Sequence, residues 1–173
     1  NFKLGIARKL IFSKWKEALG GNIKIIISGG AALQERLARV FWAAGIKVLE
    51  GSGLTETSPV IAVNSWDEDD VKFGTVGRVL NNLDVKIAED GEIMVKGPSI
   101  TKGYYKNDEA TKEAFDSNGY FHTGDIGELT PDGFLRITDR KKEMFKTAGG
   151  KYVAPQVLEN KLMESTLIAQ VMV

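Results

Sequence analysis

Residues 23–50 of the chain read IKIIISGGAALQERLARVFWAAGIKVLE, and this stretch decides the fold class. The short β-branched run at 23–27 predicts a buried strand. Apolar residues then recur at helical spacing over 33–44 and are followed by a glycine, which predicts a helix and its end. The apolar run at 46–50 predicts a second strand. A strand, a helix and a strand in this order form a βαβ unit, so we expect the two strands to pair in parallel within an α/β sheet.

Two loops follow the two predicted strands. The first has the sequence SGGAA at 28–32, and the second has the sequence GSGLTETSP at 51–59. Because the strands are expected to be parallel, both loops should lie at the same edge of the sheet, where open α/β sheets bind ligands. Glycines in the first loop would let a ligand approach the backbone N–H groups closely, although many Gly-Gly turns after strands are only turns.

The second loop is rich in oxygen ligands. Thr55 and Thr57 supply hydroxyl groups, and Glu56 supplies a carboxylate. This combination suits a phosphate with Mg²⁺, which prefers one or two carboxylates together with phosphate oxygens. In the structural alternative, Thr55 caps a helix and Glu56 favours the helix dipole. The loop alone leaves both interpretations open.

From about residue 71 the pattern changes to short alternating segments. Two of them flank EDG at 89–91 and predict a hairpin, and others follow toward the C-terminus. We therefore expect a small antiparallel β layer, in the form of a barrel or a twisted sheet. The remaining predicted elements are helices at 4–19 and 107–115, a helix that begins at Pro155, and a strand at 168–173.

Two further segments carry candidate site residues. GYFHTGDIG at 119–127 places Asp125 between two glycines, where a turn would let its carboxylate accept both hydroxyl groups of a ribose. The structural alternative is an Asx turn at a β-bulge. His122 is not favoured as a catalytic base, because no neighbouring residue is placed to tune it. In the basic segment 138–155, Arg140 could contact a ribose or a phosphate, whereas a run of lysines is more often a solvated edge.

The amino-acid composition argues against several classes of protein and kinds of site. The 23 basic residues balance 23 acidic residues, which argues against a nucleic-acid or anionic-membrane binder held by bulk charge. The absence of cysteine excludes disulfides and thiolate metal sites and fits a reducing compartment. No apolar run reaches the roughly 20 residues that a membrane-spanning helix needs. The acidic segment 66–70 is expected to be a solvated loop and not a metal site.

In chain order, several segments resemble the adenylate-forming superfamily. They are SGGAAL, EGSGLTETSP, GTVGRV, YFHTGDIG and DRKKEMFKTAGGKYVAPQVLEN, and the similarity covers nearly the whole chain. The phrases FSKWKEALGG and FKTAGGKYVAPQ favour its long-chain fatty acid–CoA ligases over luciferases and peptide-synthetase modules. The resemblance implies a reaction in two halves. ATP and a fatty acid give an acyl-adenylate and pyrophosphate, and the thiol of coenzyme A then displaces AMP.

The resemblance also implies a domain division. Residues 1–141 would be the C-terminal part of the large domain, with an α/β portion at 1–66 and a β-rich portion at 67–141. Residues 142–173 would begin the small α+β C-terminal domain. The glycine- and hydroxyl-rich loop for the β- and γ-phosphates and the C-terminal catalytic lysine of the family are not in this sequence. We therefore expect the chain to be a fragment that is inactive alone.

The resemblance assigns a role to most of the candidate residues. Thr55 would meet the α-phosphate, and Glu56 would hold Mg²⁺. Asp125 would bind the ribose hydroxyl groups, with Arg140 beside it. The full set expected to contact the nucleotide is Gly30, Ala31, Glu50, Gly51, Ser52, Gly53, Thr55, Asp125 and Arg140.

Two further positions match the part of the family that handles coenzyme A. Lys142 would be the hinge about which the small domain rotates between the half-reactions. Gly150 would lie near the pantetheine channel. One departure concerns Ser52, which stands where the family usually stacks an aromatic ring on adenine, so affinity for the base would be weaker. Another is Asn81-Asn82 in place of a common Pro-Gly turn, which we interpret as structural.

The implied ligands are ATP and Mg²⁺, with coenzyme A as co-substrate and no nucleic acid as a partner. We expect a cytoplasmic protein that meets the membrane peripherally, because long-chain acyl substrates partition into bilayers. Two alternatives stay open. The protein could activate another carboxylic acid, aryl or medium-chain, or it could be a non-catalytic nucleotide-binding module on the same scaffold. The sequence sets neither the acyl chain length nor the oligomeric state.

Overall fold

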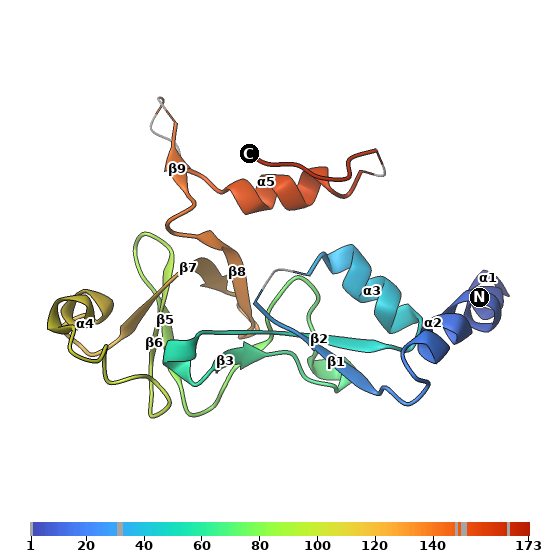
Figure 1. Cartoon of the computed structure of the whole chain (residues 1–173), viewed down its shortest axis with the longest axis horizontal. Coiled ribbons are helices and arrows are strands. Elements are labelled where there is room, and N and C mark those ends of the chain that lie inside the picture. The colour runs from blue at the N-terminus through green and yellow to red at the C-terminus, as the bar shows by residue number, and fades with distance from the viewer. Residues whose placement is uncertain (1, 31–32, 148, 150–151, 166) are drawn as a thin grey trace.

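The computed structural model describes residues 2–30, 33–147, 149, 152–165 and 167–173. Two four-stranded sheets form the body of this part of the chain, and helices lie around them (Figure 1). The first helical segment comprises α1 (Phe2–Ala7), a π-helical stretch at Arg8–Phe12 and α2 (Ser13–Ala18). It occupies the place of the single helix that the sequence predicts at 4–19.

The βαβ unit predicted from residues 23–50 is confirmed. It consists of β1 (Ile25–Ser28), α3 (Glu35–Ala43) and β2 (Lys47–Gly53). β1 and β2 pair in parallel, with Ile25 opposite Lys47 and Ser28 opposite Glu50. The carboxyl ends of both strands therefore meet at one edge of the first sheet.

β2 is longer than the sequence predicts, because it continues through the glycines of the second loop. Gly51 pairs with Val63 of the antiparallel strand β3 (Val60–Val63). A Cβ atom at Gly53 would lie 1.8 Å from the carbonyl oxygen of Pro59, so only glycine allows the two strands to approach here. The polar turn between β2 and β3 is thus held at both ends by paired backbone.

The antiparallel β layer predicted for the second half of the chain is also confirmed. Its strand order is β5-β6-β7-β8, and all neighbours are antiparallel. α4 (Asp108–Ala114) connects β6 to β7 and begins where the side chain of Asn107 accepts a hydrogen bond from the N–H of Ala110 at 3.1 Å. The strands are β5 (Asp84–Ile87), β6 (Glu92–Lys96), β7 (Phe121–Leu129) and β8 (Leu135–Arg140).

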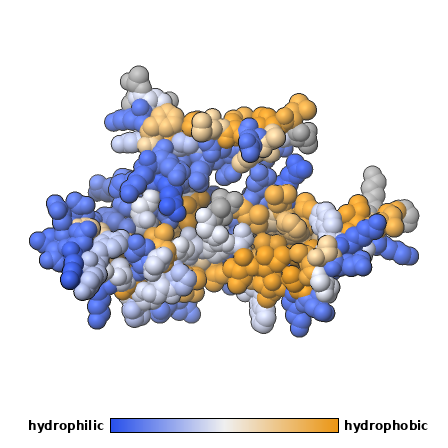
Figure 2. Space-filling model, viewed as in Figure 1, coloured by the Kyte–Doolittle hydropathy of each residue, from blue (hydrophilic) through white to orange (hydrophobic). Residues whose placement is uncertain are grey.

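Apolar surface is spread unevenly over the molecule. Figure 2 shows it gathered over the part of the first sheet around β1 and along α5, while the surface around α4 is hydrophilic. β1 is an edge strand of the first sheet, whose order is β1-β2-β3-β4 with β4 at Arg78–Val79. Ile27 on this strand is 70% exposed.

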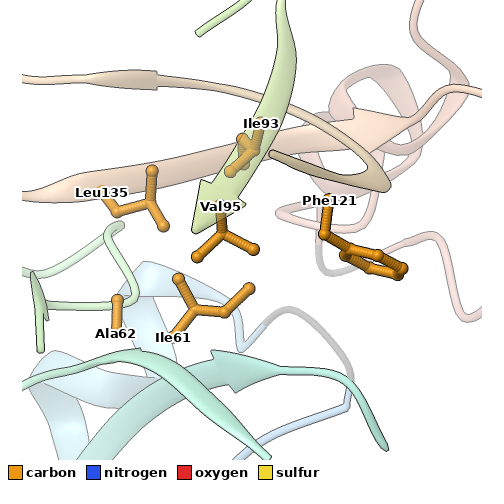
Figure 3. Packing of buried hydrophobic residues seen from close by; sticks show 6 residues of the cluster. All are labelled: Ile61, Ala62, Ile93, Val95, Phe121 and Leu135. Carbon is orange, nitrogen blue, oxygen red and sulfur yellow. The ribbon is translucent and has the colours of Figure 1, made fainter. Parts of the chain in front are cut away.

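The main hydrophobic core lies between β3 and the second sheet. Ile61 and Ala62 of β3 face residues of β6, β7 and β8 (Figure 3). Val95 is completely buried at the centre of this cluster. The members of the cluster are Ile61, Ala62, Ile93, Val95, Phe121 and Leu135. This packing fixes the second sheet against the strand that follows the polar turn.

The C-terminal region comprises a short hairpin and a helix. β9 (Phe145–Lys146) and β10 (Tyr152–Val153) pair antiparallel, and α5 (Pro155–Leu162) begins at the predicted proline. The strand predicted at 168–173 is not formed. A strand needs a paired backbone, and this segment has no strand partner among the described residues. The N–H of its last residue, Val173, instead donates to Oε1 of Glu159 in α5 at 3.0 Å.

Candidate functional site

The two loops predicted to share one edge of the sheet do lie together. Ser28 at the end of β1 is the register partner of Glu50 in β2. A Cβ atom at Gly29 would lie 3.4 Å from the carbonyl oxygen of Gly51, so the two backbones approach closely beyond that pair. Gly30 follows with a φ of +80°, a conformation that favours glycine.

Glu50 is a buried carboxyl group at this edge, with 8% of its surface exposed. Burial disfavours the charged form of Glu50 and raises its pKa to about 7. A backbone hydrogen bond at Leu33 lowers this pKa, and the negative charge of Glu35 raises it. Near neutral pH this group is therefore present both as a hydrogen-bond donor and as an acceptor. Ser52, two residues on, is half-buried and pairs with Ala62 of β3.

The turn between β2 and β3 is fixed by Thr57, which is fully buried. Its hydroxyl contacts the carbonyl oxygens of Leu54 and Pro59, and its Oγ1 accepts a hydrogen bond from the N–H of Leu54 at 2.9 Å. The hydroxyl of Thr57 is thus engaged within the protein and is not available to a phosphate, contrary to the sequence-based interpretation. Thr55 does not cap a helix, because Thr55–Thr57 is a single 3₁₀ turn with Leu54 at its N-cap position.

Thr55 and Glu56 remain as the accessible polar side chains at the start of this turn. Thr55 is exposed and Glu56 is half-buried. The hydroxyl of Tyr104 donates to Oε1 of Glu56 at 3.0 Å, and the carbonyl oxygen of Glu56 accepts from the N–H of Thr101 at 2.7 Å. Burial and the contact with Glu56 both raise the pKa of Tyr104, so its hydroxyl stays protonated as a donor. Oε2 of Glu56 makes no hydrogen bond within the described residues.

Tyr104 was not predicted as a site residue. It lies 48 positions from Glu56 in the sequence, and only the packing of the loop before α4 brings the two together. An aromatic residue in a glycine-containing loop gives no indication of such a partner.

Asp125 and Arg140 are brought together as the resemblance implies. They are register partners on β7 and β8, with Nε of Arg140 3.3 Å from Oδ1 of Asp125. The glycines on either side of Asp125 predict a turn, but Asp125 lies within β7, beside a register shift at residues 126–127. Burial raises its pKa, the positive charge of Arg140 lowers it, and the negative charges of Glu143 and Glu92 raise it; the net change is upward.

His122 does have a partner, contrary to the prediction that no nearby residue is placed beside it. Its Nδ1 lies 2.9 Å from Oε2 of Glu92, on the neighbouring strand β6. Burial opposes the charge on Glu92, but hydrogen bonds from Lys141, His122 and the N–H of Gly124 outweigh it and lower the pKa of Glu92. An ionised carboxylate can only accept, so Nδ1 of His122 carries the proton.

The remaining predicted residues have less structural support. Lys142 is exposed in the turn after β8, two residues after Arg140. Ala31 and Gly150 lie outside the described residues. Within the described part of the chain, no helix is long and apolar enough to cross a membrane. No three or more histidine or acidic side chains converge there as a metal cluster.

A βαβ unit followed by an antiparallel sheet is an arrangement that this chain shares with solved adenylate-forming enzymes. Residues 5–105 match the family described as AMP-binding enzyme, and the chain belongs to this family.

Curated relatives agree with the branch that the motifs indicate. The chain is 46% identical to the long-chain-fatty-acid–CoA ligase FadD15 of Mycobacterium bovis over 99% of its own length and 28% of that of the relative. It is 40% identical to long-chain-fatty-acid–CoA ligase 6 of the rat, over 95% of this chain and 25% of the relative. The predicted resemblance to long-chain fatty acid–CoA ligases is confirmed, for a chain that spans about a quarter of their length.

Solved structures support the same scaffold. The o-succinylbenzoate CoA synthetase of Bacillus subtilis in complex with an acyl-adenylate intermediate has a TM-score of 0.76 at 28% identity, over 91% of this chain and 35% of that one. Apo MatB from Rhodopseudomonas palustris has a TM-score of 0.68 at 35% identity, over 80% of this chain and 29% of that one.

Proposed function

We propose that the full-length protein to which this sequence belongs is an AMP-forming long-chain fatty acid–CoA ligase. It would convert a fatty acid and ATP to an acyl-adenylate and pyrophosphate, and then transfer the acyl group to the thiol of coenzyme A. The names of the relatives at 40–46% identity support the substrate class. Because this chain spans 28% of the length of the first of them, we expect it to catalyse neither half-reaction alone.

The observation that carries this proposal is the Glu56 carboxylate, held in place at the turn after two parallel strands. Tyr104 occupies one carboxylate oxygen, and the other points to no hydrogen-bond donor among the described residues. Such a group fits Mg²⁺, which keeps several waters and takes one or two protein carboxylates together with phosphate oxygens. Bound Mg²⁺ would lower the repulsion between the substrate carboxylate and the α-phosphate. Thr55, exposed beside Glu56, would donate its hydroxyl to that phosphate.

The nucleoside would lie between the two sheets' polar edges. Asp125 would accept the ribose hydroxyl groups while Arg140 holds its carboxylate in place. The backbone at residues 50–53 would pass under the adenine, and Gly30 with Ala31 would line its pocket. Ser52 presents no aromatic face for stacking, so the base would be bound more weakly than in relatives with an aromatic residue there.

The same proposal includes the domain division. Residues 1–141 would belong to the large domain and residues 142–173 to the small one, with Lys142 as the hinge and Gly150 near the pantetheine of coenzyme A. The location of β9, β10 and α5 after the exposed Lys142 is compatible with this division. We further propose a cytoplasmic enzyme that meets membranes only peripherally, where its acyl substrate resides.

Fatty-acid-dependent ATP–pyrophosphate exchange by the full-length protein tests the proposal. We expect exchange with long-chain fatty acids and none with the 173-residue chain. Glu56→Ala should lower the exchange rate by roughly 10²–10³, the usual loss when one group that stabilises transition-state charge is removed. Tyr104→Phe should cost about tenfold, because it frees the carboxylate without removing it.

A matched control is Glu109→Ala, which removes an exposed carboxylate from the first turn of α4 and should leave exchange unchanged. Near-normal activity of a folded Glu56→Ala protein would exclude the metal role of Glu56. Exchange with aryl or medium-chain acids but not with long-chain acids would replace the proposed substrate class. Absence of exchange with every acid would favour a non-catalytic nucleotide-binding module.

A further inference from the structure

A buried carboxylate outside the proposed nucleotide contacts joins three separate parts of the chain. Glu92 at the start of β6 is 3% exposed. Its Oε1 accepts the N–H of Gly124 at 3.0 Å, while its Oε2 accepts Nδ1–H of His122 at 2.9 Å and Nζ of Lys141 at 2.8 Å. Charge-assisted hydrogen bonds of this kind are stronger than neutral ones.

Lys141 is held by more than this one contact. Its Nζ also lies 2.7 Å from Oδ2 of Asp90, in the turn that precedes β6. Its backbone N–H donates to the carbonyl oxygen of Gly124 at 2.8 Å. The contacts with Asp90 and Glu92 raise the pKa of Lys141, so the ammonium group stays charged. Both the main chain and the side chain of Lys141 are therefore tied to the second sheet.

These contacts lie directly beside the proposed ribose-binding pair and the proposed hinge in the sequence. Gly124 precedes Asp125, and Lys141 follows Arg140, so the bonded groups flank both members of the proposed ribose-binding pair. Lys141 also immediately precedes Lys142, which is exposed. The ion pairs with Asp90 and Glu92 are thus made by the residue directly before the proposed hinge.

We propose that Asp90 and Glu92 form an acidic clamp on Lys141 that sets where the interdomain hinge begins. Lys141 is then a positioning residue: it keeps Arg140 beside Asp125 while the backbone from Lys142 onward rotates. Without the clamp, rotation would spread into residues 139–141 and misplace the small domain. This inference rests on the proposed function, and it adds which residue holds the chain in place directly before the hinge.

The test uses Lys141→Met in the full-length protein, because this change removes the ammonium group from a half-exposed side chain of similar length. Adenylation and thioester formation from preformed acyl-adenylate are measured separately in single turnovers. We expect thioester formation to slow by about tenfold and adenylation to change by less than about threefold. Lys141→Arg keeps the charge and should restore thioester formation. Two controls should match the wild type in both steps. Glu89→Gln changes an exposed carboxylate in the same turn as Asp90 that makes no ion pair with Lys141, and Lys112→Met changes an exposed lysine on α4.

Hydrogen exchange on the same proteins provides a readout that needs no activity. In the wild type, the amides of residues 139–141 should be protected, whereas the amide of Lys142, which donates no hydrogen bond within the described residues, should exchange rapidly. Lys141→Met should speed exchange in 121–126 and 139–141 by at least about tenfold and leave 84–87 unchanged. Equal losses in both half-reactions, or an exchange boundary that stays at Lys142, would overturn the clamp. If the wild type catalyses neither half-reaction, the proposed function fails, and the exchange boundary alone decides whether Lys141 is the fixed point.

Discussion

The two sheets of this chain differ in how completely they bury their own apolar side chains. The second sheet and β3 enclose a core in which Val95, Ile93 and Leu135 are at most 1% exposed. Beside the first sheet there is a smaller cluster of buried residues, Ala44, Ile46 and Val48. The helical segment Arg8–Ala18 on its flank has no fully buried residue. The surface over β1 is correspondingly apolar (Figure 2).

The difference bears on the two parts of the candidate site. Asp125, Arg140 and the Asp90–Glu92 clamp stand on the sheet that packs against β3, so their geometry depends on this core and little on β1. Gly29, Gly30 and Glu50 stand at the edge formed with β1, where fewer buried contacts hold the backbone. Local stability follows such contacts, so the adenine edge should open before the ribose pair does. Three predictions test this contrast.

The largest effect is expected for Phe121→Ala in the main core. Phe121 is 3% exposed and stacks edge-on against Phe115 with 5.4 Å between ring centroids. Removing a buried phenylalanine side chain typically lowers the free energy of unfolding by about 3–5 kcal/mol. Urea denaturation of the 173-residue chain measures the change. A loss below about 1 kcal/mol would mean that this core is not what stabilises the chain.

The next effect concerns Glu50 and depends on pH. Its pKa is about 7 in the folded chain and about 4.5 without burial, so between these values the folded state binds more protons than the unfolded state. Stability should therefore fall as pH rises from about 5 to about 8 and then level off. Glu50→Gln stays neutral and removes that loss, which is on the order of 3 kcal/mol.

Denaturation at both pH values, with wild type and Glu50→Gln side by side, isolates this one group from other titrating residues. Glu89→Gln, an exposed carboxylate, should show the same pH dependence as the wild type. If Glu50→Gln is no more stable than the wild type at about pH 8, the carboxyl group is better solvated than its burial indicates. The Glu50 carboxyl group would then not destabilise the edge formed by β1 and β2.

The sequence predicted the features that depend on residues close together in the chain, and it missed those that depend on distant ones. The βαβ unit, the hairpin around EDG, the Asn107 cap and the proline that begins α5 depend on neighbouring residues and were predictable. The extension of β2 was not, since it depends on pairing with β3. The contacts of Glu56 with Tyr104 and of Glu92 with His122 join residues 48 and 30 positions apart, and no local pattern encodes them. The sequence alone offered Asp125 and Arg140 as separate candidates for ribose or phosphate contacts, and only the family resemblance placed them beside each other. They are 15 positions apart and meet because β7 and β8 pair.

The smallest effect on stability is expected at Ile27, and it sharpens the comparison from the other side. Ile27 is 70% exposed on an edge strand, so Ile27→Lys removes little buried contact and should change the free energy of unfolding by less than about 0.5 kcal/mol. Its effect should appear in association instead, because an apolar edge strand is a template for pairing with another chain and a lysine there opposes it. Sedimentation of the 173-residue chain at rising concentration should show less self-association for Ile27→Lys than for wild type, with equal urea midpoints for the two proteins. A drop in the midpoint comparable with that of Phe121→Ala would mean that β1 contributes to the stability of the chain as much as the second sheet does, and the contrast between the two sheets would not hold.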